Sequence, residues 1–174
     1  MQRTQITGTD THKPRTHTCG ALRTEHVGQE VVLKGWVDTR RDLGGVIFID
    51  LRDRYGLTQV VFEPHVNAAA HELANSLRGE FVISIKGTVR RRDDDQVNPK
   101  LPTGEVEVYA SELVILNTAD VLPFAVSAHE EKTTLANEDL RLKYRYLDLR
   151  RTALQENLLM RHKLYQVTRR YFDN

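Results

Sequence analysis

The sequence lacks the features that mark secreted and membrane proteins. It holds one cysteine, Cys19, among 174 residues, so no disulfide can form within the chain. No apolar run reaches the roughly 18 residues that a membrane-spanning helix requires. The first residues also contain no apolar stretch of the kind found in a secretory signal. These absences predict a cytoplasmic protein with no membrane partner.

Motifs that mark catalytic sites are missing as well. The sequence contains no phosphate-binding P-loop, no Gly-x-Gly-x-x-Gly, no Gly-x-Ser-x-Gly and no His-Glu-x-x-His. His12, His17 and Cys19 lie near one another in sequence, but their spacing matches no zinc pattern and supplies no fourth ligand. We therefore expect this chain to hold no catalytic residue, no metal and no cofactor.

Charge is distributed unevenly along the chain. The formal net charge of +1 divides into +1 for residues 1–30, −4 for residues 31–137 and +4 for residues 138–174. The central part is therefore acidic, and general attraction to phosphate is weak support for a nucleic-acid partner there. Any contact with RNA must come from local basic clusters.

From Glu30 onward the pattern becomes that of β-strands. Alternating runs rich in Val, Ile and Phe predict strands at 30–38, 46–53, 57–63, 80–91 and 105–116. A helix over 66–78, ended by Gly79, is predicted from apolar residues at helical spacing, which are Val66, Ala70, Leu73, Ala74 and Leu77. Five strands with one helix between the third and fourth is the order of an OB-fold, so we predict a mainly β chain built on this closed barrel.

The remaining segments suggest four parts. Residues 1–14 are polar and lack periodicity, which predicts a flexible leader before a barrel domain at 15–117. Residues 118–151 are expected to form a linker or hinge, with Asn137 as the N-cap where helix begins. Residues 152–174 form the last part, an amphipathic helix whose apolar side chains cover about half of its circumference.

The hairpin at 46–63 places an aromatic ring on the outer side of the predicted barrel. A four-residue turn at 53–56 pairs residue 49 with 60, so alternation turns Ile49 and Val60 inward and Phe48 and Gln59 outward. An outward ring beside an amide offers a stacking platform and a hydrogen-bonding edge to a single-stranded base. A ring covered by a loop or by the N-terminal segment fits the pattern equally well.

Charged residues near the strand ends could support such a surface. The first predicted strand runs into Arg40 and Arg41, and Arg90 to Arg92 lie at the end of the fourth, where arginines suit phosphates or base edges. Glu107 lies on the outward side of the fifth strand, where a carboxylate would repel phosphate unless it accepts hydrogen bonds from a base such as guanine. Taken alone, each of these residues also fits an ordinary solvated surface.

Three stretches together resemble bacterial-type aspartyl-tRNA synthetase, a class II aminoacyl-tRNA synthetase. They are RTHTCGALR at 15–23, GWVDTRRDLGGVIFIDLRDRYGLTQVVFEP at 35–64 and RLKYRYLDLRR at 141–151. The resemblance implies an OB-fold anticodon-binding domain, a hinge and the first helix of a truncated class II α+β catalytic domain. It also implies a homodimeric parent enzyme that uses ATP and Mg²⁺ to attach aspartate to tRNA-Asp, with tRNA-Asn as a further candidate.

The resemblance also implies roles for particular residues. Phe48 would stack on the central anticodon base, and Gln59 and Arg41 would read the edge of that base. Glu107, with Arg92 and the loop at 93–98 that ends in Asn98, would face the first base. Leu43 matches a position where the choice between tRNA-Asp alone and both tRNAs is tuned. Supporting basic contacts would come from Arg40, Arg78 and Arg90.

The match is incomplete, and other functions stay open. The strand and proline that complete the first class-defining motif are absent, as are the second and third motifs, so we expect this chain to be an inactive fragment. Thr39 stands where the family often has a third consecutive arginine. A free-standing, non-catalytic tRNA-binding OB protein is one alternative, although it would leave the apolar face of the last helix uncovered. A general binder of single-stranded nucleic acid is another, and it would show little preference for the tRNA-Asp anticodon loop.

Overall fold

The computed structural model describes residues 14–126 and 135–173 of the chain. Of the leader predicted at 1–14, all but Pro14 therefore lies outside the described residues, and so does the middle of the predicted linker. The described residues form two compact units, one ending at Val121 and the other beginning at Leu122. None of the described helices is long and apolar enough to span a membrane.

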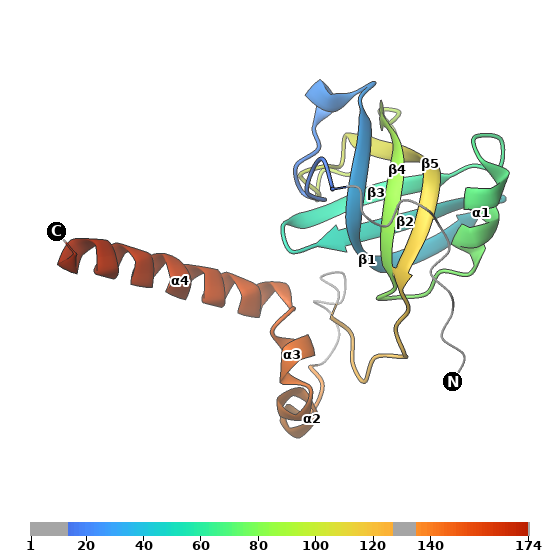
Figure 1. Ribbon diagram of the computed structural model, residues 1–174. Helices are drawn as coiled ribbons and strands as arrows, with labels where there is room; N and C mark the ends of the chain where they lie inside the picture. Colours follow the sequence, from blue (N-terminus) through green and yellow to red (C-terminus); the bar gives the residue numbers. More distant parts are fainter. Residues whose placement is uncertain (1–13, 127–134, 174) are drawn as a thin grey trace. The chain divides into compact units, whose positions relative to one another are not determined.

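The first unit is a closed five-stranded barrel with the strand order β1-β2-β3-β5-β4 (Figure 1). Its strands are β1 (Glu30–Leu43), β2 (Val46–Asp53), β3 (Gly56–Phe62), β4 (Val82–Arg91) and β5 (Val106–Asn117). Antiparallel pairing of β1 with β4 closes the barrel, and β3 pairs with β5 in parallel. Helix α1 (Ala68–Asn75) lies between β3 and β4 in sequence, and a short 3-10 helix η1 (Thr24–His26) precedes β1. The predicted OB-fold barrel is confirmed.

Strand β1 is longer than the sequence pattern indicated. Its predicted end was residue 38, yet residues as far as Leu43 remain paired with β2. A register shift between Val37 and Thr39 interrupts the alternation there, so the sequence pattern ends although the strand continues. Gly44 and Gly45 both have positive φ and form the tight turn that lets the two strands pair to their ends.

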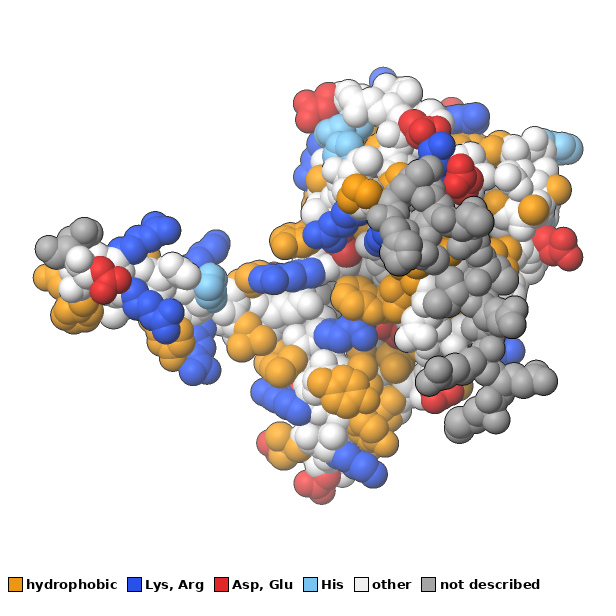
Figure 2. Space-filling model, in the orientation of Figure 1, with side chains coloured by type: hydrophobic (Ala, Val, Ile, Leu, Met, Phe, Trp, Pro, Cys, Tyr) orange, Lys and Arg blue, Asp and Glu red, His pale blue; other side chains and the backbone are white. Residues whose placement is uncertain are grey.

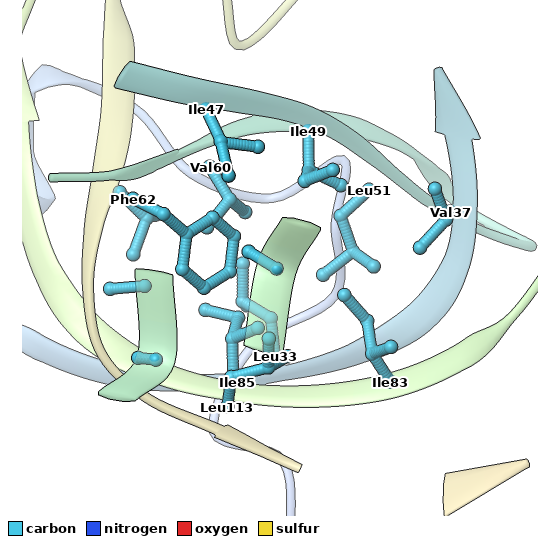
Figure 3. Close-up of a cluster of buried hydrophobic side chains, with 14 of the residues drawn as sticks. Leu33, Val37, Ile47, Ile49, Leu51, Val60, Phe62, Ile83, Ile85 and Leu113 are labelled. Atoms are coloured by element: carbon cyan, nitrogen blue, oxygen red, sulfur yellow. The ribbon is translucent and has the colours of Figure 1, made fainter. Parts of the chain in front are cut away.

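The barrel interior contains the apolar side chains that alternation assigned to it (Figure 3). The register pairs Ile47 with Phe62 and Ile49 with Val60, as the four-residue turn predicted, and all four side chains are at most 1% exposed. Side chains from β1, β4 and β5 complete this core, among them Leu33, Val37, Ile83, Ile85 and Leu113. Because the interior is filled, any ligand must bind on the outside of the barrel.

Helix α1 is shorter than predicted. It runs from Ala68 to Asn75 rather than over 66–78, and the side chain of Asn67 caps it by accepting a hydrogen bond from the Ala70 amide at 3.0 Å. Ser76 ends the helix before Gly79 because its hydroxyl donates to the Leu73 carbonyl at 2.7 Å, a local bond that competes with continued helix. Val66, expected on the apolar face, precedes the helix and is 41% exposed.

The second unit is helical, with α2 (Glu138–Lys143), α3 (Arg145–Asp148) and α4 (Thr152–Phe172). Asn137 caps α2 as predicted, since its side chain accepts a hydrogen bond from the Asp139 amide at 3.1 Å. The helix that starts there is broken at Tyr144, whose φ of −110° and ψ of 45° are not helical. Helix α4 agrees with the predicted last helix, and apolar and basic side chains both lie exposed along it (Figure 2).

The segment before η1 crosses the turn between β2 and β3 at very close range. Asp53 accepts hydrogen bonds from the amides of Cys19, Tyr55 and Gly56 at 2.9, 2.7 and 3.1 Å, so one buried carboxylate holds both the crossing segment and the turn. At Gly20 a Cβ atom would lie 2.2 Å from the Tyr55 carbonyl oxygen. The crossing therefore requires glycine at position 20.

We predict that Gly20→Ala lowers the free energy of unfolding of the barrel by about 1–3 kcal/mol, because the added methyl group must displace backbone. Gly79→Ala is the matched control, since a Cβ at Gly79 would meet nothing within 4 Å. We expect this control to change the free energy by less than about 0.5 kcal/mol. Urea unfolding of both variants measures the difference, and equal effects would contradict the close crossing.

Candidate nucleic-acid interface

Phe48 lies on the outer face of β2, at the start of a continuous polar surface. Its ring is partly exposed, whereas the neighbouring Ile47 and Ile49 are fully buried. Across the strands Phe48 pairs with Arg41 of β1 and with Val61 of β3. The predicted outward orientation is thus confirmed, and the ring stands directly beside a guanidinium-bearing residue.

A chain of hydrogen bonds runs over this face from β1 to β5. One nitrogen of Arg41, Nη2, donates to Asp50 Oδ1 at 2.8 Å and to Gln59 Oε1 at 3.2 Å. Gln59 Nε2 in turn donates to Glu107 Oε2 at 2.8 Å. The amide of Gln59 is therefore oriented from both ends, with its oxygen toward Arg41 and its nitrogen toward Glu107. A base beside Phe48 would meet a hydrogen-bonding edge that is already ordered.

Glu107 and Arg92 form the buried end of this chain. Alternation correctly turned Glu107 outward, yet it is only 5% exposed and Arg92 only 6%. Arg92 Nε donates to the Val106 carbonyl at 3.2 Å and lies 3.9 Å from Glu107 Oε2. Burial lowers the pKa of Arg92, and the opposing charge of Glu107 partly offsets that effect.

One guanidinium nitrogen of Arg92 lacks a hydrogen-bond partner among the described residues. This atom, Nη2, is buried. Leaving a charged donor buried without an acceptor costs free energy, which an incoming acceptor would recover. An unpaired N–H beside a carboxylate is complementary to guanine, whose O6 and N7 accept and whose N1 and N2 donate.

Tyr109 and Arg90 extend the surface along β4 and β5. The guanidinium carbon of Arg90 lies 3.9 Å from the centre of the Tyr109 ring, which fixes Arg90 by stacking. Burial raises the pKa of Tyr109, and the negative charge of Glu107 raises it further, while Arg90 lowers it. The sequence reasoning did not single out Asp50 or Tyr109 as site residues. Both share a strand face with a residue that it did name, so alternation could have identified them.

Not all of the outer face is open. Asp50, Arg52 and Val61 lie on it by alternation but are at most 9% exposed. Neighbouring side chains account for this burial. Arg41 pairs with Asp50, Arg52 is paired with Asp38 and Glu80, and Val61 stands in register between Phe48 and Tyr109.

The other residues predicted for the site lie around this surface rather than in its hydrogen-bond chain. Leu43, at the end of β1, is 62% exposed. Arg40 donates to the Ala74 carbonyl at 3.3 Å and to Asn75 Oδ1 at 3.0 Å, so it binds the C-terminus of α1. Asn98 shapes its own loop by accepting from the Lys100 amide at 3.1 Å, and Arg78 is exposed just after α1.

No three His, Cys, Asp or Glu side chains of the described residues come together as a metal site. Of the three residues weighed as a metal cluster, His12 lies outside the described residues. Cys19 is fully buried, and burial followed by the charge of Asp53 raises the pKa of its thiol. A neutral, buried thiol is a poor metal ligand and a poor nucleophile.

Comparison with known proteins matches each of the two units to a protein family. Residues 31–116 match the OB-fold nucleic acid binding domain of the tRNA anticodon-binding type, and residues 137–174 match the class II tRNA synthetases for D, K and N. An asparaginyl-tRNA synthetase from Pyrococcus horikoshii, solved with asparaginyl-adenylate, superimposes with a TM-score of 0.72 at 26% identity. That match covers 89% of this chain and 33% of the other. The two units are thus those of a class II aminoacyl-tRNA synthetase.

Relatives of similar sequence identify the family within this class. The aspartate–tRNA(Asp/Asn) ligase of Salinibacter ruber is 62% identical over 98% of this chain and 27% of its own length. The aspartate–tRNA ligase of Enterococcus faecalis is 51% identical over 92% of this chain and 26% of its own length. The chain belongs to the aspartate–tRNA ligase family, and it spans about a quarter of the length of these relatives.

We predict opposite changes in the pKa of Tyr109 from two substitutions on this surface. Glu107→Gln should lower it by removing a negative charge, and Arg90→Met should raise it by removing a positive one. Glu112→Gln is the control, because Glu112 is on the same strand but lies 3.5 Å from Lys86. NMR titration of ring-labelled tyrosine measures all three, and shifts in the same direction for the first two would contradict the arrangement.

Proposed function

We propose that this chain is the anticodon-reading part of an aspartate–tRNA ligase. The whole protein would activate L-aspartate with ATP as aspartyl-adenylate and then transfer the aspartyl group to tRNA-Asp. The observation that carries the proposal is the partly exposed ring of Phe48 beside an ordered chain of polar side chains that ends at the unpaired nitrogen of Arg92. A stacking platform next to fixed donors and acceptors suits unstacked bases of an RNA loop.

The polar groups suit the anticodon that pairs with the aspartate codons, which begins with guanine and has uracil at its centre. With the uracil stacked on Phe48, the oxygen of Gln59 would accept from its N3–H, and Arg41 would donate to a uracil carbonyl. The guanidinium of Arg41 can do so because its side chain is 44% exposed. The amide edge is already held by its neighbours, so little ordering would be lost on binding.

The first base would lie against Arg92 and Glu107. The carboxylate of Glu107 would accept from N1 and N2 of guanine, and Arg92 Nη2 would donate to O6. Adenine offers no donor at N1, so it would leave the carboxylate unmatched. The loop that contains Asn98 would cover this base, and Arg40, Arg78 and Arg90 would supply basic character around the site.

The chemistry of the whole protein would lie outside this chain. ATP and Mg²⁺ would be its cofactors. The described residues contain no metal-ligand cluster, and the sequence contains no P-loop. The protein would act in the cytoplasm as a homodimer. tRNA-Asn is a second candidate substrate, because the Salinibacter ruber relative is an aspartate–tRNA(Asp/Asn) ligase. Leu43, exposed at the end of β1, is the residue we propose to influence that choice.

We predict that Phe48→Ala weakens binding of the tRNA-Asp anticodon stem-loop by about 1–3 kcal/mol, the usual contribution of one stacked base. Tyr55→Ala is the matched control, because Tyr55 is an exposed aromatic residue of the same barrel at the turn between β2 and β3. Fluorescence anisotropy measures the affinities, and circular dichroism checks the fold. Equal affinities for wild type and Phe48→Ala would remove Phe48 from the site.

The same titration separates the alternative functions. A stem-loop with a scrambled anticodon should bind more weakly than the tRNA-Asp sequence. A general binder of single-stranded nucleic acid would bind both alike, and this result would overturn the proposal of anticodon reading.

We further predict that the product of the whole gene charges tRNA-Asp with aspartate, and that this 174-residue chain alone does not. The reason is that the second and third class-defining motifs are absent from this sequence. Incorporation of radiolabelled aspartate into tRNA measures both. A stop codon directly after codon 174 would instead favour a free-standing tRNA-binding protein.

A further inference from the structure

Three arginines of the second unit surround one carboxylate. Asp148, the last residue of α3, is fully buried and accepts from Arg141 Nε at 3.0 Å, Arg141 Nη2 at 3.3 Å and Arg145 Nη1 at 2.5 Å. Arg151 Nη1 lies 3.9 Å from the same carboxylate. Glu138 also acts on Arg141 by its charge, so three positive groups face two negative ones and the cluster keeps a net positive charge.

Asp148 stays ionised within the cluster. Burial alone would raise its pKa, but the hydrogen bond from Arg141 and the charges of Arg141, Arg145 and Arg151 outweigh burial and lower the pKa below its usual value. The carboxylate is therefore a fixed anchor that sets the directions of the guanidinium groups. The break at Tyr144 contributes, because it separates α2 from α3 and lets Arg141 and Arg145 reach Asp148 from different helices.

The arginines retain donors and contact with solvent. Each guanidinium has five N–H donors, and the bonds to Asp148 use two from Arg141 and one from Arg145. The side chain of Arg145 is 48% exposed, that of Arg151 27% and that of Arg141 23%. Helix α4 starts beside them with no acidic residue in its first turn, so its dipole adds to the positive potential.

We infer that the cluster of Arg141, Arg145 and Arg151 binds a backbone phosphate of RNA outside the anticodon loop, with Asp148 as the residue that positions the arginines. The planar, multiply donating guanidinium matches a phosphate better than a point charge does. The surroundings are basic over the whole of residues 138–174, which carry nine Lys and Arg against five Asp and Glu. The inference depends on the proposed function for the identity of the RNA as a tRNA.

The test compares full-length tRNA-Asp with its isolated anticodon stem-loop, titrated against the 174-residue chain at several KCl concentrations. Arg145→Gln should weaken tRNA binding about threefold to tenfold and reduce the slope of log K against log[KCl] by about 0.9, the value for one lost phosphate contact. Binding of the stem-loop should be unchanged. Arg161→Gln is the control, because Arg161 is an exposed arginine of α4 that donates to the Tyr165 hydroxyl.

The Asp148→Asn variant distinguishes the alignment of the arginines by Asp148 from the effect of the net charge of the cluster. This substitution adds one positive charge, so a site that depends on charge alone would bind tRNA more tightly, whereas loss of alignment should weaken binding. Tighter binding, or equal slopes for Arg145→Gln and Arg161→Gln, would overturn the inference. Failure of the anticodon proposal gives a different result, because stem-loops with native and scrambled anticodons would then bind with equal affinity. The salt slopes of Arg145→Gln and Arg161→Gln could still be compared with any RNA that binds the chain.

Discussion

Strand alternation in a closed barrel determines where this domain can act. Every second side chain of β1 to β5 must help fill an interior whose residues include Ile47, Ile49 and Phe62. Closure also pairs β1 with β4, so neither of these strands is left as the free edge of an open sheet. Recognition must therefore use the outward half of the strands and the loops that join them. Phe48, Gln59 and Glu107 are the outward residues on which the proposed recognition depends.

The outer face is ordered before any ligand arrives. Gln59 is held by Arg41 at one end and by Glu107 at the other, and Arg90 is held against the ring of Tyr109. Such contacts reduce the conformational entropy that binding would otherwise remove. Arg92 differs from them, since burial leaves one of its donors unsatisfied. Among the described residues of this surface, the buried Nη2 of Arg92 lacks an acceptor, which favours a ligand that brings an acceptor to that place.

The sequence was most informative where a local rule decides the structure. A four-residue turn fixed the register of β2 and β3, and with it the outward orientation of Phe48. The sequence was least informative where contacts between residues far apart in the chain determine the surroundings of a side chain. The burial of Glu107 depends on groups from other strands, and the side chain of Arg40 is used by the end of α1, 34 residues later in the chain. The break at Tyr144 was likewise not predicted: Arg145 and Arg151 lie three residues from Asp148, at ordinary helical spacing, whereas nothing in the periodicity indicated that α2 would end before α3 begins.

The two units differ in the range over which their charges act. The segment 31–137, which contains the barrel strands except for Glu30, carries a net charge of −4, and Arg41 and Arg92 of the candidate site are engaged with Asp50 and Glu107. Under the proposed function, attraction of the barrel to RNA would then be short-ranged and depend on stacking and matched hydrogen bonds, which discriminate between bases. The segment 138–174 carries +4, and such excess charge attracts any phosphate backbone from beyond contact distance. The salt-dependent part of the affinity for RNA would thus arise mainly in the helical unit, and discrimination between RNA sequences would arise in the barrel. Under the proposed function, RNA whose bases cannot satisfy Glu107 and Arg92 would gain little from the barrel, because the segment that forms it supplies no net positive charge to hold a backbone without matched bases.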